Sequence, residues 1–220
     1  MSCQSKGRRL SMQKAPPSYY ESNFLSRRWR TGLAKMVRKL LPPGWESSKM
    51  LDVGTGDGYT IRLVKPDGDI LGIDTDTTME VSAVHRGVAF SVGSAYQVPF
   101  PDGSFDLVTC IEVVEHLDKP HDALVEVRRV LREGGCAIFT TPVPKFSWRV
   151  IWWAWTKLGP GKRWDTTPHV SDLHMWDGHG SRGLAPMLQE LGFAIEATDT
   201  CNDGYVAGVR AKKTVSGPQV

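Results

Sequence analysis

Paired cysteines are missing from the sequence. The four cysteines, at positions 3, 110, 136 and 201, lie far apart and form no Cys-x-x-Cys motif. This spacing is not that of a structural zinc site, and free thiols are typical of a reducing compartment. We therefore expect four free cysteines in a cytoplasmic protein.

Long apolar runs are also missing. No run approaches the roughly 20 residues of a membrane span, and the first 20 residues lack the apolar core of a secretory signal. There is no internal repeat or low-complexity block. With 220 residues, of which 40% are hydrophobic, the chain suits one globular domain with a sizeable core.

Acidic residues are scarce at the start of the chain. Residues 1–45 contain ten Lys or Arg residues and one acid, Glu21, whereas the rest of the chain contains 17 basic and 23 acidic residues. A basic N-terminal segment joined to an acidic domain is typical of proteins that bind nucleic acid or anionic lipid. It is equally the pattern of a solvated helix face joined to a disordered tail, and the sequence leaves both interpretations open.

Composition and periodicity divide the chain into four parts. Residues 1–18 are polar and basic, which predicts a disordered tail. Residues 19–44 form an N-terminal helical segment, because apolar side chains recur at steps of three and four over residues 22–41. The main domain is expected over residues 45–213, followed by a C-terminal tail at 214–220.

Strands and helices alternate through the main domain. Short apolar runs predict strands at residues 49–53, 69–74, 88–92, 105–111, 136–141, 193–200 and 204–212. Helical periodicity predicts helices at residues 122–135, where Gly134 and Gly135 supply the stop, and at residues 183–193. Such alternation indicates an α/β fold with a mainly parallel sheet covered on both faces.

A glycine-rich turn, in "LDVGTGDGY", follows the first strand. Gly54, Gly56 and Gly58 give the pattern G-x-G-x-G, without the last glycine of the dinucleotide pattern G-x-G-x-x-G. Glycine lets the backbone turn sharply and lets a ligand approach closely. Asp52 precedes the turn, and Asp74 ends the second strand, where a carboxylate can accept hydrogen bonds from a ribose diol.

With these motifs, the sequence resembles the class I S-adenosylmethionine-dependent methyltransferases over about residues 45–211. "LDVGTGDG" is similar to their first motif and "ILGID" to their second-strand acidic motif. "VPFPDGSFDLVTCIEVVEHL" and "ALVEVRRVLREGGCAIFTTP" resemble small-molecule methyltransferases that include the ubiquinone-pathway O-methyltransferases. The resemblance implies a Rossmann-like, doubly wound sheet of seven strands in the order 3-2-1-4-5-7-6, with the last strand antiparallel.

The resemblance also implies S-adenosylmethionine as cofactor. In this family the glycine turn packs on the amino-acid part of the cofactor and the second-strand acid binds the ribose. Where the family usually has an adenine-binding Asp, this chain has Ser94, a weaker acceptor. The full predicted cofactor set is Asp52, Gly54, Thr55, Gly56, Gly58, Asp74, Thr75, Ser94, Ala95, Ile111 and Glu112.

The stretch "IEVVEHL" leaves the fourth strand beside this site. In a helical turn, Glu112, Glu115 and His116 would share one face and could hold Mg²⁺ or another divalent cation. The resemblance adds that some ubiquinone-pathway and small-RNA methyltransferases carry such a metal site. In the RNA enzymes a further histidine completes the site, for which His174 is the best-placed candidate here, followed by His169. The alternative is that Glu112 and Glu115 face solvent or cap a helix, and that His116 only lines the pocket.

Catalysis without a metal needs a general base for an O-methylation. His116 is the first candidate, because the pKa of histidine suits proton removal near neutrality, and His174 is the second. Methyl transfer is a direct displacement, so alignment of nucleophile and donor supplies much of the catalysis.

An unusual insert follows the fifth strand. Residues 145–181 contain six of the eight tryptophans, and long loops in compact domains are usually functional. Within the insert, residues 146–158 are apolar nearly all round, with Arg149 and Lys157 as the only charges. Three interpretations stay open: a lid over a hydrophobic substrate, a peripheral membrane contact, and packing on the sheet edge or in an oligomer.

Three functions are therefore weighed. The first is S-adenosylmethionine-dependent O-methylation of a small hydrophobic acceptor, such as a quinone precursor, lipid or isoprenoid. The second is RNA methylation, against which the sequence lacks both an RNA-binding module and the Asn/Asp-Pro-Pro-Tyr motif of many base methylases. The third is a cofactor-binding protein without catalysis. We expect the first, in a cytoplasmic protein with or without membrane contact.

Overall fold

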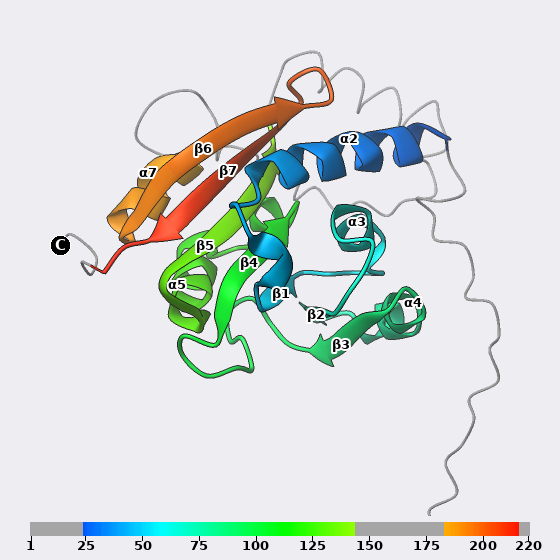
Figure 1. The fold of residues 1–220 in the computed structure, drawn as a ribbon, viewed down its shortest axis with the longest axis horizontal. Coiled ribbons are helices and arrows are strands. Elements are labelled where there is room, and N and C mark those ends of the chain that lie inside the picture. Colours follow the sequence, from blue (N-terminus) through cyan, green and yellow to red (C-terminus); the bar gives the residue numbers. More distant parts are fainter. Residues whose placement is uncertain (1–23, 144–182, 216–220) are drawn as a thin grey trace, which may run out of the picture.

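A seven-stranded sheet forms the centre of the molecule (Figure 1). The computed structural model describes residues 24–143 and 183–215. The strand order is β3-β2-β1-β4-β5-β7-β6, and β7 runs antiparallel to both of its neighbours. The predicted fold class and topology are confirmed. The strands are β1 Met50–Val53, β2 Ile70–Asp74, β3 Val88–Val92, β4 Phe105–Ile111, β5 Leu131–Pro142, β6 Phe193–Cys201 and β7 Val206–Lys213.

Helices cover both faces of the sheet. One buried cluster joins the strands to α5 and α7, and a second joins them to α2, α3 and α4 (Figure 1). None of the helices in the described ranges has the length and apolar character needed to cross a bilayer. The helices are α2 Phe24–Leu40, α3 Tyr59–Val64, α4 Glu80–His85, α5 Pro120–Val130 and α7 Leu184–Glu190, with short 3-10 turns η1 Trp45–Ser47, η2 Thr77–Met79 and η3 Val114–His116.

The N-terminal helix α2 is part of the core. Leu33, Met36, Val37 and Leu40 are buried at the expected helical spacing. Helix α2 packs closely on the sheet at Gly208 of β7. A Cβ at this position would lie 2.7 Å from Leu40 Cδ1, so the glycine makes the close contact possible. Only the first turn departs from the predicted apolar stripe, because Phe24 and Leu25 are exposed.

The predicted end of the helix at residues 122–135 is wrong. Helix α5 stops at Val130, because Leu131 already pairs with Phe105 as the first residue of β5. The pairing then shifts, and Cys136 lies beside Leu107. Gly134, at φ +73°, lies within this irregular part of the strand rather than at a helix end.

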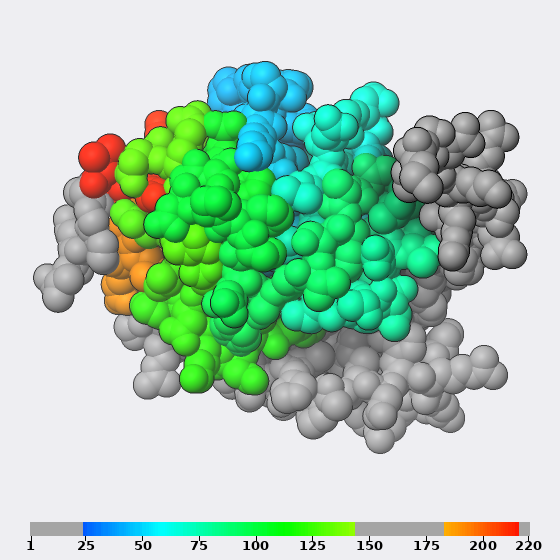
Figure 2. Space-filling view, turned by 90° about the horizontal axis from the view of Figure 1, so that it is seen from below, coloured from blue at the N-terminus to red at the C-terminus, as the bar shows by residue number. Residues whose placement is uncertain are grey.

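A view from below shows how the chain is distributed over this side of the molecule. In Figure 2 the teal and green segments from the middle of the chain fill the centre of the view. The light-blue segment that follows helix α2 lies at one margin and the C-terminal segments, in orange and red, lie at another.

Candidate cofactor-binding site

The ends of three neighbouring strands create the site. Val53 of β1 lies beside Ile73 of β2 and Cys110 of β4 in the parallel register. The residues that follow these strands therefore meet at one edge of the sheet, as expected for ligand sites in open α/β folds.

The glycine turn has a left-handed backbone at each glycine. Gly54, Gly56 and Gly58 have φ values of +72°, +53° and +74°, which L-residues with side chains rarely adopt. The N–H groups of Gly54 and Thr55 both donate to the Ile73 carbonyl, at 2.8 and 3.0 Å, so the turn is fixed to β2. A Cβ at Gly54 would overlap Val113, whereas a Cβ at Gly56 would meet nothing within 4 Å. Gly56 therefore leaves open space beside the turn.

Asp74 joins the turn to the end of β2. Its Oδ2 accepts the Gly56 N–H at 2.8 Å, and its Oδ1 accepts the Asp76 N–H at 2.9 Å. A carboxylate has about four lone-pair sites, so each oxygen can accept a further hydrogen bond. The adjoining Thr75 is exposed, and Thr55 is buried against Gly72.

Asp52 is buried within β1. Its Oδ1 accepts a hydrogen bond of 2.6 Å from the Thr109 hydroxyl on β4. Burial raises the pKa of Asp52 to about 7, and the charge of Asp74 acts in the same direction. The carboxyl group therefore keeps its proton well above the pH at which an exposed aspartate loses it.

We expect this proton to make the stability of the fold depend on pH. Because the pKa of Asp52 is raised from 3.8 in the folded chain, its stabilising contribution is complete below about pH 4 and is lost as the pH rises towards 7. One such group lowers the free energy of unfolding by about 1.4 kcal/mol per pH unit in that range.

The measurement is urea unfolding of the wild type and D52N at pH 5, 6 and 7. The amide introduced by D52N is neutral at every pH, so the variant should lose less stability than the wild type as the pH rises. Glu115 contributes equally to both proteins, so the difference between them isolates residue 52. Parallel pH profiles would contradict the assignment.

The loop after β3 contains the predicted adenine contacts. Ser94 Oγ accepts the Tyr96 N–H at 3.2 Å, and the Gln97 N–H donates to the Ser94 carbonyl at 3.1 Å. Ser94 and Gln97 also line a surface pocket of about 700 Å³ that extends to Arg129 of α5. Whether Ser94 and Ala95 bind adenine stays a prediction.

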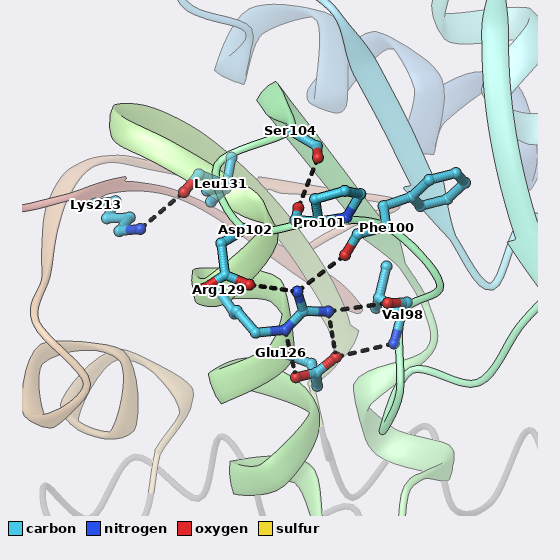
Figure 3. Close-up of polar contacts among 9 residues, drawn as sticks. All are labelled: Val98, Phe100, Pro101, Asp102, Ser104, Glu126, Arg129, Leu131 and Lys213. Atoms are coloured by element: carbon cyan, nitrogen blue, oxygen red, sulfur yellow. Dashed lines mark hydrogen bonds and ion pairs between the residues drawn. The ribbon is translucent and has the colours of Figure 1, made fainter.

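Arg129 fixes the end of this loop, a role that the sequence reasoning missed. Its guanidinium donates to the carbonyls of Val98 and Phe100, each at 2.9 Å, and pairs with Asp102 and Glu126 (Figure 3). The Glu126 carboxylate also accepts the Val98 N–H at 2.9 Å. Arg129 lowers the pKa of Glu126, so both partners are charged at neutral pH. The three-residue spacing of Glu126 and Arg129 in a predicted helix could have indicated this ion pair.

The stretch after β4 does not form the predicted helical face. Only Val114–His116 form a 3-10 turn, and Glu112 precedes it with a left-handed φ of +53°. Among the described residues, no group of three His, Cys, Asp or Glu side chains is placed to hold a metal ion. The helical turn that would give Glu112, Glu115 and His116 a common face is therefore not formed, while a metal site completed by His174, outside the described residues, stays a prediction.

Each of these three residues has a different environment. The Glu112 carboxylate forms an ion pair of 2.8 Å with Arg30 of α2. Burial raises the pKa of Glu115 to about 8, with a further contribution from the charge of Glu112. Its Oε2 has no hydrogen-bond partner in the described part of the chain. His116 is exposed, and Ile111 is buried at the end of β4.

The remaining candidates lie outside the described residues. His169, His174 and the tryptophan-rich segment 146–158 belong to residues 144–182. Their predicted roles as base, ligand, lid or membrane contact stay predictions.

Comparisons with known proteins agree with this geometry. A family model described as a methyltransferase domain matches residues 51–139. The demethylmenaquinone methyltransferase of Thermotoga maritima is 30% identical over 186 residues, covering 76% of this chain and 77% of the relative. The chain belongs to the class I S-adenosylmethionine-dependent methyltransferases.

A solved methyltransferase structure shows the same fold. An S-adenosylmethionine-dependent methyltransferase of Thermotoga maritima superposes with a TM-score of 0.69 at 22% identity, covering 89% of this chain and 94% of that one. Its description as a possible histamine N-methyltransferase applies to that protein. Three other curated relatives, from Streptomyces fradiae, Schizosaccharomyces pombe and Mycolicibacterium smegmatis, are matched over only 43%, 44% and 66% of their own lengths.

The residues at the glycine turn fit S-adenosylmethionine chemically. The space beside Gly56 lies next to an Asp74 carboxylate with unused acceptor capacity, which suits a ribose diol. Val113 packs against Gly54 and closes the turn towards β4. The glycine turn, closed on one side by Val113, therefore borders an open space with the Asp74 carboxylate at its edge.

Proposed function

We propose that the chain transfers the methyl group of S-adenosylmethionine to a hydroxyl oxygen of a small hydrophobic acceptor, of the quinone-precursor class. The observation that carries the proposal is the open glycine turn with Asp74 at its side. The acceptor class is supported by the similarity to a demethylmenaquinone methyltransferase over most of both chains.

The chain's own residues would bind and align the reactants. When bound, the cofactor supplies a methyl group on a positively charged sulfur. The glycine turn would hold the amino-acid part of the cofactor and Asp74 its ribose, and the end of β4 would border the reacting atoms. A hydroxyl acceptor also loses a proton, for which His116 on the η3 turn is our candidate base.

A transfer assay tests the proposal. The purified protein is incubated with methyl-labelled S-adenosylmethionine and a panel of hydroquinones, catechols and prenylated phenols. We expect label in at least one hydrophobic acceptor, and mass spectrometry of the product to place the methyl group on oxygen. Intact cofactor binding without transfer to any hydroxylated acceptor would contradict the proposal, and label on carbon would contradict its O-methyl form.

A further inference from the structure

The outer side of helix α2 carries positive charge only. The helix contains no acidic residue, and its exposed Lys and Arg side chains lie on the side opposite its buried residues. We call this surface the basic face of α2, and it consists of Arg27, Arg28, Lys35, Arg38 and Lys39.

Little within the described structure neutralises the basic face. Among the described residues, Lys39 is its only member in an ion pair, with Asp199 at 3.3 Å, and the Lys39 side chain is still 73% exposed. Arg38 donates to the neutral Val64 carbonyl at 3.0 Å and keeps its charge. The positive charges of the face are therefore available to an anionic partner.

Two large apolar side chains adjoin the basic face. Phe24 and Leu25, in the first turn of α2, are 68% and 58% exposed. Phe24 lies nearly in line with Arg28 and Lys35, which follow at helical spacing. Cations beside exposed apolar side chains are typical of helices that lie in the interface of an anionic bilayer. The phosphates of a nucleic acid would pair with the cations but would leave Leu25 in water.

The basic face is preformed, because contacts with the rest of the fold hold α2. Leu33 and Val37 are fully buried on its inner side. The Asn202 side-chain amide donates to the Trp29 carbonyl at 3.2 Å, and Arg210 donates to the Leu40 carbonyl at 3.2 Å. Docking through this face would therefore not require the helix to fold on binding, which saves the entropy cost of ordering it.

The inner side of α2 contacts the predicted cofactor site. The Trp29 indole N–H donates to Glu112 after β4 at 3.3 Å, and Arg30 donates at 3.3 Å to the Thr60 hydroxyl in α3, which follows the glycine turn. Figure 1 shows α2 at the outside of the described fold, next to α3. A helix with its side chains is about 10–12 Å across, so little more than this helix separates the basic face from the site.

We propose that the outer side of α2 docks the protein on an anionic lipid bilayer, with the basic face against the headgroups and Phe24 and Leu25 in the interfacial region. A hydrophobic acceptor dissolved in the bilayer then lies close to the predicted cofactor site. The docking itself goes beyond the proposed function and does not depend on it, because binding to a bilayer requires no methyl transfer.

Vesicle sedimentation with the full-length chain tests the docking. One set of vesicles is pure phosphatidylcholine, and the other is an equimolar mixture of phosphatidylcholine and phosphatidylglycerol, each at low and at physiological ionic strength. The variant R28Q/K35Q removes two charges of the basic face, and F24A/L25A removes the two apolar side chains. All four side chains are exposed, so neither variant opens the core.

The matched control is K49Q/K119Q. Lys49 and Lys119 are also exposed but lie outside α2, before β1 and before α5. This variant loses the same net charge as R28Q/K35Q, so a comparison of the two separates the position of the charges from their number.

We expect the wild type to bind the anionic vesicles at least about tenfold more tightly than the neutral ones, and to bind less tightly as salt screens the charges. R28Q/K35Q should weaken binding to anionic vesicles about tenfold or more, because each cation near such a surface contributes about a factor of five. F24A/L25A should weaken binding about threefold or more. K49Q/K119Q should stay within about twofold of the wild type.

Four results would overturn the proposal. Equal binding to neutral and anionic vesicles would favour an apolar contact, such as the one predicted for residues 146–158. Equal losses in R28Q/K35Q and K49Q/K119Q would mean that only the net charge matters. Binding to a mixed-sequence RNA in a filter assay, lost in R28Q/K35Q and without any binding to vesicles, would assign the face to nucleic acid.

The fourth result concerns the basic residues that precede α2. Full affinity in R28Q/K35Q, with loss of binding when these residues are replaced by glutamine, would assign the contact to them instead; they are Lys6, Arg8, Arg9 and Lys14. Thermal unfolding checks that each variant is folded. If R28Q/K35Q is not, R27Q/K39Q removes two other charges of the basic face and decides by the same comparison.

Discussion

Replacement of Asp74 by alanine is expected to reduce the affinity for S-adenosylmethionine about 100-fold or more. The variant removes the carboxylate that would accept from the ribose, and each charge-assisted hydrogen bond contributes about 1.5–3 kcal/mol. It also removes the acceptor of the Gly56 and Asp76 N–H groups, so the turn loses its anchor. Titration calorimetry with the purified variant measures the loss.

Asp76 provides the matched control for Asp74. It lies two residues further along and is exposed, and its carboxylate accepts from the Thr78 backbone and hydroxyl at 2.9 and 2.6 Å. D76A should therefore keep its cofactor affinity within about threefold of the wild type, since an exposed turn cap contributes little away from its own turn. An affinity of D74A equal to that of D76A would contradict the role of Asp74.

Replacement of Gly54 by alanine is expected to destabilise the fold by about 2–5 kcal/mol. A positive φ costs a residue with a side chain about 1–2 kcal/mol, and overpacking adds about 1–3 kcal/mol. Both apply here, because Gly54 has φ +72° and its Cβ would overlap Val113. Urea unfolding of the purified variant at fixed pH measures the change.

Two further variants separate the two costs. Gly134 has nearly the same φ, +73°, but a Cβ there would meet nothing within 4 Å, so G134A should show only the backbone cost. In a double-mutant cycle, V113A should recover about 1 kcal/mol or more of the loss in G54A, because it removes the overlap. A stability of G54A equal to that of G134A, with no coupling to Val113, would contradict the packing argument.

The positions of the strands follow from local signals, whereas the order of the strands was implied by the family resemblance. Strands β1, β2 and β4 are short apolar runs between polar breaks, as the buried strands of a parallel sheet require, whereas β6 alternates buried and more exposed residues. The G-x-G-x-G pattern also predicted the turn after β1. Gly54, Gly56 and Gly58 all adopt positive φ values there, which favour glycine. These features depend on residues close together in sequence.

The errors in prediction have long-range causes. The helix around residue 130 ends early because Leu131 pairs with Phe105, which lies 26 positions away in the chain. The stretch after β4 departs from a helical face because Glu112 binds Arg30, 82 positions earlier. Helical periodicity reports only on residues close together in the chain, so it cannot predict the pairing of Leu131 with Phe105 or of Glu112 with Arg30.

The sequence by itself determined the fold class and the position of the glycine turn and Asp74, and its resemblance to known methyltransferases indicated the family. Periodicity and glycine placement act over a few residues, so they can be read without coordinates. Only the tertiary structure decided how the charges near the turn are paired. Arg30, Glu112, Asp52 and Glu115 owe their ion pairing or raised pKa values to burial and to partners brought by other elements. Burial and charge pairing arise only when the chain folds, which is why they had to be observed.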